Sequence, residues 1–438
     1  MVSQQAGKDF TDTLFRYTIE LPVTPYKSML LKRTDLMSSY IQQGSHSYWR
    51  AITALFMGSF VTFAILYCTQ PLIPVFSQDF NTSPAIASLS VSLATASLAV
   101  FMIAVSWISD AVGRKAIMAA ALLSSAALTV MVAYSGNFEV LLFIRVLQGA
   151  LLGGFPAIAM AYINEEFNPE CSGAAMGIYV SGTAIGGLLG RVIVGALTDL
   201  FSWHTALAVI GFISFAVSIW FWFNLPESRN FSPQKRSVRA VAGVLVRSIK
   251  QPLLLSLYVI GFLVMGSFVA LFNYIGYVVM APPYNLSHTV TGLIFVVYLV
   301  GTFSAALMGK LSDSMGKAKV LCMAISIMLV GCLVTLHMNL FIKLLGVAVF
   351  TFGFFGSHSV ASSWVGKSAV IDKAQASSLY LMFYYLGSST IGAVGGEFLK
   401  WHGWGGVVEL ISCALTAALC IGMMLYIPRR ETCSRKSM

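Results

Sequence analysis

The chain has 438 residues, of which 57% are hydrophobic and only 10% are charged. A soluble globular domain carries about a quarter charged residues, so this composition excludes an ordinary soluble domain and predicts a protein that lies mostly in lipid. The formal net charge of +10 points to a nucleic-acid partner only if the basic residues gather on one polar surface.

The N-terminal segment is the first polar part of the chain. Residues 1–50 mix charged and polar residues, and the first sustained apolar run begins near Ala51. That is too late for the apolar core of a signal peptide. We therefore expect residues 1–50 to form a cytoplasmic tail.

A membrane-spanning helix needs about twenty apolar residues, and the sequence contains twelve such runs. Ser83 and Pro84, a preferred N-cap and a preferred first helical residue, predict the start of the second helix. The fold class predicted is an all-α membrane protein. Its parts are a six-helix bundle at 51–225, a cytoplasmic linker at 226–250, a second six-helix bundle at 251–428 and a cytoplasmic tail at 429–438.

Lysine and arginine predict the orientation, because cytoplasmic loops are enriched in both. With both termini in the cytoplasm, 23 of the 27 basic residues lie on the cytoplasmic side. Lys343 and Lys400 fall on the other side, and Arg145 and Arg191 fall inside helices. The positive charge is thus an orientation signal, and no nucleic-acid partner is expected.

A short polar stretch occurs twice, each time after the second apolar run of its half. Its two aspartates and its two glycines are both separated by 203 residues, which indicates two homologous halves, although one copy alone could be a plain turn. Glycine permits a tight turn there, and Ser109 or Asp110 is expected to cap the third helix. The motif residues are Asp110, Gly113, Arg114 and Lys115 in the first copy, and Gly309, Asp313 and Gly316 in the second.

The first copy resembles the loop between helices 2 and 3 of the major facilitator superfamily, although Ser106 and Ala111 replace its usual Gly and Arg. The resemblance implies two six-helix bundles that rock about a central site. It also implies that this loop latches the two halves on the cytoplasmic side when the site opens outward. Because the first copy keeps more of the pattern, we expect it to carry most of the latch.

The fourth helix contains Arg145, Gln148 and Gly149, which is similar to the superfamily's Arg-x-x-Gln-Gly motif. A charge inside a spanning helix is costly and suggests a function. The resemblance ties Arg145 and Gln148 to proton coupling. The alternative is an arginine that extends to the membrane interface.

The fifth helix has glycines at the spacing of the superfamily's antiporter motif, with Gly187 in place of its Pro and Arg191 in place of its final Gly. Aligning helix 11 with helix 5 sets Glu397 opposite Arg191. We expect this pair to close an outer gate, or one of the two residues to bind substrate or to serve proton coupling; the alternative is two separate charges at the interface. The matching glycines are Gly173, Gly182, Gly186 and Gly190.

Candidate substrate-binding residues are polar and aromatic side chains on helices 1, 7, 10 and 11. In the superfamily, helices 1, 4, 7 and 10 line the central cavity, and small-molecule sites combine apolar walls with few polar groups. For each tyrosine, helix packing is the alternative role, whereas the charge of His358 can change near neutral pH. The candidates are Tyr67, Gln70, Asn273, Tyr277, His358, Tyr380 and Tyr384.

Beyond residue 50 the chain resembles the YnfM group of bacterial inner-membrane transporters, on segments such as Tyr67–Pro74 and His358–Trp364. The resemblance implies proton-coupled export of a small molecule such as a drug, sugar or siderophore, by a monomer in the lipid bilayer of the inner membrane. Proton-coupled uptake and a non-transporting receptor are the alternatives.

An enzyme is not expected, since no phosphate-binding loop, nucleophile elbow or His-Glu-x-x-His pair occurs. The seven cysteines have no metal-ligand spacing. We therefore expect no metal and no cofactor.

Overall fold

The computed structural model describes residues 40–231, 243, 246–368 and 373–426. Within these ranges every named element is a helix, and the one β-pairing is an isolated parallel bridge between Ile41 and Phe167. The prediction of an all-α membrane protein is confirmed. Most of the predicted N-terminal tail, the whole C-terminal tail and part of the linker lie outside the described residues.

The N-terminal half contains six membrane-spanning segments, two of them interrupted. The first begins at His46 rather than near Ala51, and it breaks after Tyr67, where Pro71 and Pro74 lack backbone donors. Gly153 interrupts the fourth. The elements are α3 (His46–Tyr67), η1 (Gln70–Leu72), α4 (Ile73–Asp79), α5 (Pro84–Val112), α6 (Arg114–Ala133), α7 (Phe138–Leu152), α8 (Gly154–Glu166), α9 (Pro169–Leu200) and α10 (Trp203–Asn224).

The C-terminal half repeats this plan. Its last element is 54 residues long, and His402 and Gly403 leave helical geometry inside it, so that it holds two of the predicted helices. The elements are α12 (Pro252–Met280), α13 (His288–Leu293), η2 (Ile294–Val297), α14 (Tyr298–Met315), α15 (Lys317–Val334), α16 (Leu340–Ser368) and α17 (Lys373–Tyr426).

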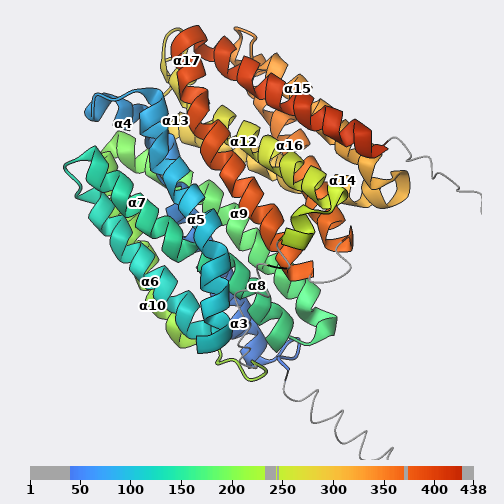
Figure 1. Cartoon of the computed structure of the whole chain (residues 1–438). Coiled ribbons are helices and arrows are strands. Elements are labelled where there is room, and N and C mark those ends of the chain that lie inside the picture. The colour runs from blue at the N-terminus through green and yellow to red at the C-terminus, as the bar shows by residue number, and fades with distance from the viewer. Residues whose placement is uncertain (1–39, 232–242, 244–245, 369–372, 427–438) are drawn as a thin grey trace, which may run out of the picture.

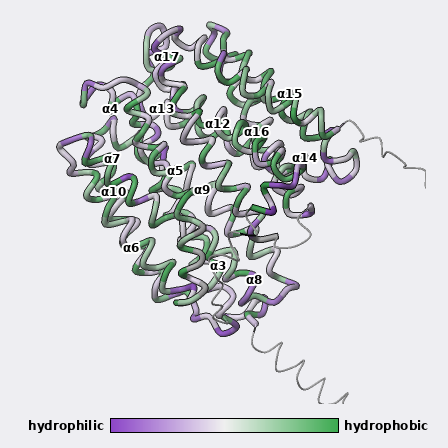
Figure 2. The backbone as a smooth tube through the Cα atoms, in the orientation of Figure 1, coloured by the Kyte–Doolittle hydropathy of each residue, from purple (hydrophilic) through white to green (hydrophobic). Residues whose placement is uncertain are grey.

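Among the described residues, 11 helical stretches are long and apolar enough to cross a membrane, and the last of them, of 52 residues, contains the two helices of α17. The count therefore agrees with twelve transmembrane helices. Figure 2 shows hydrophilic residues gathered at the turns and hydrophobic residues along the helices. At the start of α5, Ser83 Oγ accepts a hydrogen bond from the backbone N–H of Ile86 at 3.3 Å and Pro84 is the first helical residue, as predicted.

The two halves lie side by side, with α5 packed along α17 and α9 packed against α13 (Figure 1). The turns at Gly113 and Gly316 each follow an even number of crossings, and so does the linker. They therefore share one end of the molecule, here called the motif end. Asp79 and Asp199 follow odd numbers of crossings and lie at the opposite end.

A single glycine joins two helices in each copy of the duplicated motif. Gly113 has φ of 120° and Gly316 has φ of 89°, conformations that other residues rarely adopt. The expected cap of the third helix is wrong: Ser109 and Asp110 lie inside α5, and Gly113 is the N-cap of α6, with no side-chain cap bond. Because α5 continues to Val112, these two residues have helical backbone and cannot serve as caps.

Lys343, one of the two basic residues on the unexpected side, has a structural partner. Its ammonium donates to the backbone oxygen of Thr335 at 2.5 Å and lies 5.8 Å from the ring centre of Trp404. Thr335 is the C-cap of α15, where a cation meets the negative end of the helix dipole. The buried Lys343 thus stabilises a helix end.

The glycines of α9 form a seam with α3. A Cβ added at Gly182 would lie 2.5 Å from the backbone oxygen of Phe56, and one added at Gly186 would lie 2.2 Å from that of Phe60. Neither oxygen can move without moving α3. Small residues at this spacing let two helix backbones approach in lipid, where packing drives association.

We predict that Gly186→Ala destabilises the protein by about 1–3 kcal/mol, the usual cost of overpacking. Gly177→Ala is the matched control, because nothing lies within 4 Å of a Cβ there and alanine favours a helix interior. Thermal unfolding of both variants in detergent measures the difference. Equal melting temperatures for the two variants would contradict the seam.

Candidate functional site

The first copy of the motif is bound within its own half. Arg114, 6% exposed, donates to Glu165 of α8 twice, from Nε to Oε2 at 3.0 Å and from Nη2 to Oε1 at 2.7 Å. Lys115 pairs with Glu227 of the linker at 2.8 Å. Such bidentate pairs fix geometry as well as adding energy. The α5–α6 turn is thus tied to α8 and to the linker, while the side chain of Asp110 lies outside the described part.

The second copy is more exposed. Asp313 pairs with Lys367 at 3.1 Å, and the two side chains are 65% and 64% exposed. A pair in water contributes about 0–1 kcal/mol. Gly309 faces α16, where an added Cβ would lie 3.5 Å from Ser359 Oγ. The two copies are therefore unequal in their contacts.

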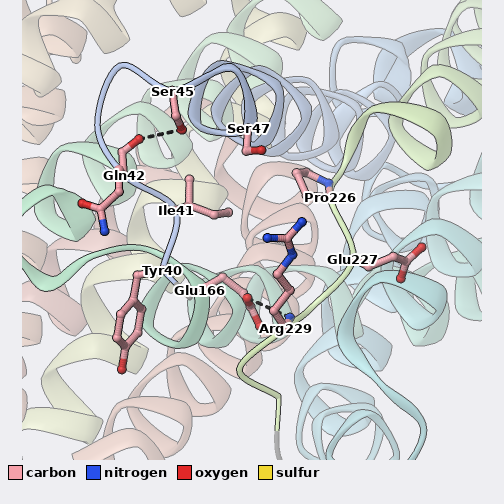
Figure 3. Close-up of a pocket in the computed structure, with 9 residues that line it drawn as sticks. All are labelled: Tyr40, Ile41, Gln42, Ser45, Ser47, Glu166, Pro226, Glu227 and Arg229. Atoms are coloured by element: carbon pink, nitrogen blue, oxygen red, sulfur yellow. Dashed lines mark hydrogen bonds between the residues drawn. The ribbon is translucent and has the colours of Figure 1, made fainter. Parts of the chain in front are cut away.

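A pocket of about 240 Å³ lies at the motif end, between the N-terminal segment, the end of α8 and the linker (Figure 3). The buried Glu166 accepts the backbone N–H groups of Arg229 and Asn230 at 2.9 and 3.0 Å. The backbone N–H of Ile41 donates to the backbone oxygen of Glu166 at 2.7 Å. All of its lining residues belong to the N-terminal half and the linker, so this pocket lies outside the interface of the two halves.

Arg145 is completely buried and is surrounded by backbone oxygens. Its Nε donates to Ser90 O at 2.6 Å, Nη1 to Ile65 O at 3.0 Å and Nη2 to Leu66 O at 2.5 Å. Ile65 and Leu66 belong to the last turn of α3, whose carbonyls lack helical partners. Arg145 therefore caps the broken first helix and is stabilised by the negative end of its dipole.

Gln148 completes this cluster. Its Oε1 accepts from Arg145 Nη1 at 2.9 Å, and its Nε2 donates to Thr129 Oγ1 at 2.8 Å and to Ser125 O at 3.2 Å. The structure thus brings the two motif residues of helix 4 together and links them to α6. Their role in proton coupling stays a prediction.

Arg191, 3% exposed, lies between the two halves. Its Nε donates to Gln70 Oε1 at 2.7 Å, and its Nη1 donates to the backbone oxygen of Gly187. Its guanidinium carbon lies 4.3 Å from the ring centre of Tyr67, 4.7 Å from that of Phe295 and 5.3 Å from that of Tyr298. Aromatic faces stabilise a cation at these distances.

The predicted pair of Arg191 and Glu397 is not formed in this structure. Both residues are described, and neither an ion pair nor a hydrogen bond joins them. Arg191 turns toward Gln70 instead. Gly396 packs on α5, where an added Cβ would lie 2.4 Å from Ala85 Cα, and the next residue, Glu397, is half-buried.

Two of the candidate substrate residues bind each other across the halves. Gln70 Nε2 donates to Asn273 Oδ1 at 2.7 Å, and Asn273 Nδ2 donates to Gly392 O at 3.3 Å. The hydroxyl of Tyr277 donates to Ile73 O at 3.1 Å. These polar groups therefore join the halves in this conformation.

The candidates on α16 and α17 form an aromatic cluster. His358 Nδ1 lies 2.9 Å from the hydroxyl of Tyr380, and the His358 ring lies 4.6 Å from that of Tyr384. A row of aromatic rings extends from this cluster. The ring centres of His358 and Phe354 are 6.2 Å apart, and those of Phe354 and Phe268 are 3.6 Å apart. The structure thus brings His358, Tyr380 and Tyr384 together.

Sequence reasoning missed other contacts between the halves. Thr95 Oγ1 lies 2.9 Å from Ser389 Oγ, and Ser389 donates to Ser92 O at 2.8 Å. Asp199 accepts the backbone N–H groups of His288 and Thr289 at 3.0 and 2.7 Å, which caps α13. Small hydroxyl residues are common in these helices, so no pattern in the sequence singled out this pair. Among the described residues, no group of three or more His, Cys, Asp or Glu could hold a metal ion.

We predict that Arg145→Met lowers the melting temperature in detergent, because backbone oxygens of α3 and α5 lose a charged donor worth about 1.5–3 kcal/mol per bond. The melting temperature of Arg145→Lys should lie between those of the unchanged protein and of Arg145→Met, since an ammonium cannot reach all these acceptors. The exposed Lys367→Met is the control. A methionine variant as stable as the control would exclude the capping role.

Comparison with known proteins places the chain. The family model of the Major Facilitator Superfamily matches residues 55–369 and 257–437. The chain is 46% identical over 381 residues to the MFS-type transporter YybF of Bacillus subtilis (strain 168), covering 87% of this chain and 94% of that protein. It is 42% identical over 389 residues to the inner membrane transport protein YnfM of Escherichia coli (strain K12), covering 89% and 93%.

Among solved structures, a bacterial homologue of the human lysosomal transporter Spinster, in an inward-facing and unoccupied conformation, superposes with a TM-score of 0.69 at 16% identity, over 87% of this chain and 96% of that one. At this identity the likeness concerns the fold. The family model and the two relatives carry the assignment: the chain belongs to the Major Facilitator Superfamily of membrane transporters.

Proposed function

We propose that this transporter exports a small molecule, such as a drug, sugar or siderophore, across the bacterial inner membrane in exchange for protons. The observation that carries the proposal is the glycine seam of α9 on α3, which gives the antiporter spacing at Gly182, Gly186 and Gly190 a physical use. Without side chains between them, the two backbones meet directly, so that α9 and α3 move as one body when the halves rock.

The motif end is assigned to the cytoplasm on the distribution of lysine and arginine. Hydrogen bonds between the halves, at Thr95–Ser389, Gln70–Asn273 and Asp199–Thr289, lie from mid-span to the opposite end. In this conformation the outer path is therefore closed. Opening the outer path requires these bonds to break and the motif loops to join the two halves on the cytoplasmic side.

Proton coupling is proposed for Arg145 and Gln148 with Arg191 and Glu397. Arg145 would hold the break in the first helix, and a proton on the half-buried Glu397 would change the charge beside the outer closure. The competing proposal, proton-coupled uptake, is favoured by Gly187, which stands where the antiporter motif has Pro.

Everted membrane vesicles acidified inside by respiration distinguish the two directions. Adding an exported compound outside should discharge the pH gradient, read with an acridine dye, because protons leave as the compound enters. A symporter would instead carry protons inward with the compound. Candidate compounds come from screens that compare cells lacking the transporter gene with cells that overexpress it. The screens measure susceptibility to toxic compounds and the export of metabolites. If no compound moves protons in either direction, coupled transport is excluded.

The outer closure can be tested by a disulfide. The Thr95 and Ser389 hydroxyl oxygens lie 2.9 Å apart, so cysteines at both positions can form a bond of about 2.05 Å. We expect oxidation of the double variant to stop transport and a reductant to restore it, while each single variant stays active. Full transport by the oxidised double variant would show that this contact need not open.

The unequal motif copies predict unequal losses of transport. Arg114→Ala should reduce flux in vesicles several-fold, because its bidentate pair with Glu165 is partly buried and worth about 1.5–3 kcal/mol. Asp110→Asn is expected to reduce flux as well, because Asp110 belongs to the same motif copy. Asp313→Asn should change flux less, since its ion pair is exposed. Flux is compared at equal expression. Loss of transport in Asp313→Asn with normal transport in Arg114→Ala would reverse the ranking.

A further inference from the structure

The charge of Arg191 is not balanced by an acid in the part of the chain that the structure describes. No carboxylate among the described residues forms an ion pair with it. Of its five N–H groups, one on Nε binds Gln70 and one on Nη1 binds Gly187 O, which leaves three without a partner among the described residues. A buried cation with unused donors calls for an anion.

Arg145 is the internal comparison. It is equally buried, but four acceptors surround it: Ser90 O, Ile65 O, Gln148 Oε1 and Leu66 O. Two of these belong to the negative end of α3, which offsets the charge. Arg145 therefore needs no ligand, and Arg191, with two acceptors, does.

The surroundings of Arg191 restrict the form of that anion. Its guanidinium carbon lies 4.3–5.3 Å from the ring centres of Tyr67, Phe295 and Tyr298, so aromatic rings pack around the planar group. A carboxylate matches the remaining N–H groups because it can accept two parallel bonds from a guanidinium. The buried hydroxyl of Tyr298 has no hydrogen-bond partner within the described ranges and can donate a further bond.

A row of buried aromatic rings adjoins this charge and would contact the rest of the molecule. The ring centre of Tyr298 lies 5.4 Å from that of Phe268. The Phe268 ring stacks on the Phe354 ring with the centres 3.6 Å apart, and the Phe354 ring stacks on the His358 ring with the centres 6.2 Å apart. The row thus runs from the unpaired charge to the His358 cluster. Aromatic walls next to one directed polar group are the usual composition of a small-molecule site.

We propose that Arg191 recognises a carboxylate, or an anionic group of the same shape, on a transported molecule whose apolar or aromatic body lies along this row. The inference rests on the proposed transport function and names its substrate class: organic anions. Gln70 Oε1 accepts from Nε of the same guanidinium, and the Gln70 amide holds Asn273 of the other half. An anion on the remaining N–H groups of Arg191 would therefore lie beside one bond of the outer closure.

Binding by the purified full-length protein in detergent tests the proposal. The probes share one ring system: 2-naphthoate, its neutral amide, and the cationic 2-naphthylmethylammonium. A ligand that binds the folded state raises the melting temperature with its concentration. We expect 2-naphthoate to do so and the amide and ammonium compounds to have little effect. Equal shifts for all three, or none for the carboxylate, would overturn the proposal.

Variants locate the effect. Arg191→Gln should weaken 2-naphthoate binding about tenfold to hundredfold, the loss of a charged hydrogen-bonded pair, and Arg191→Lys should retain part of it. Tyr298→Phe keeps the ring and removes one hydroxyl, so it tests the site even if Arg191→Gln does not fold; we expect several-fold weaker binding. Undiminished binding in folded Arg191→Gln or in Tyr298→Phe would contradict the assigned contacts.

The vesicle assay separates this inference from the proposed function. Flux of cations or neutral compounds that is independent of Arg191 would overturn the anion assignment and leave the transporter function intact. Binding of 2-naphthoate that depends on Arg191, without movement of any compound, would support the site and overturn the transport function.

Discussion

The structure depends on one constraint: inside a bilayer, a charge or an open backbone carbonyl has no water to bind. The first spanning helix breaks after Tyr67 and leaves the carbonyls of Ile65 and Leu66 without helical partners, while α7 carries a buried arginine. Arg145 donates to both carbonyls and to Ser90 of α5. Each group satisfies the other, and three helices are thereby fixed around the break.

Arg191 meets the same constraint differently. Its partners are one amide, one carbonyl and three aromatic rings, and two of the rings belong to the other half. Its environment therefore depends on how the halves are placed. Through Gln70 it is also connected to Asn273, so charge and closure are linked at this point. Arg145 joins helices within one half, whereas the contacts of Arg191 come from both halves.

The strengths of the contacts match a protein made of two bodies that move. Within the N-terminal half, the bidentate Arg114–Glu165 pair and the direct backbone contact at Gly186 are strong and leave no slack. Between the halves, Thr95–Ser389 and Gln70–Asn273 are neutral hydrogen bonds, each worth about 0.5–1.5 kcal/mol. A few such bonds close one end of the molecule at a small free-energy cost of opening.

The sequence by itself determined the all-helical membrane fold, the two halves and the glycine turns at Gly113 and Gly316, because apolar run length and φ preference are local properties. It also singled out both buried arginines, since charges are rare in such runs. Only the tertiary structure decided their partners. The partner of Arg191 is Gln70 and not Glu397, because the packing of the helices, such as that of Gly396 on α5, sets which side chains meet. Helix packing depends on contacts between residues that are far apart in the chain, which local sequence patterns do not reveal.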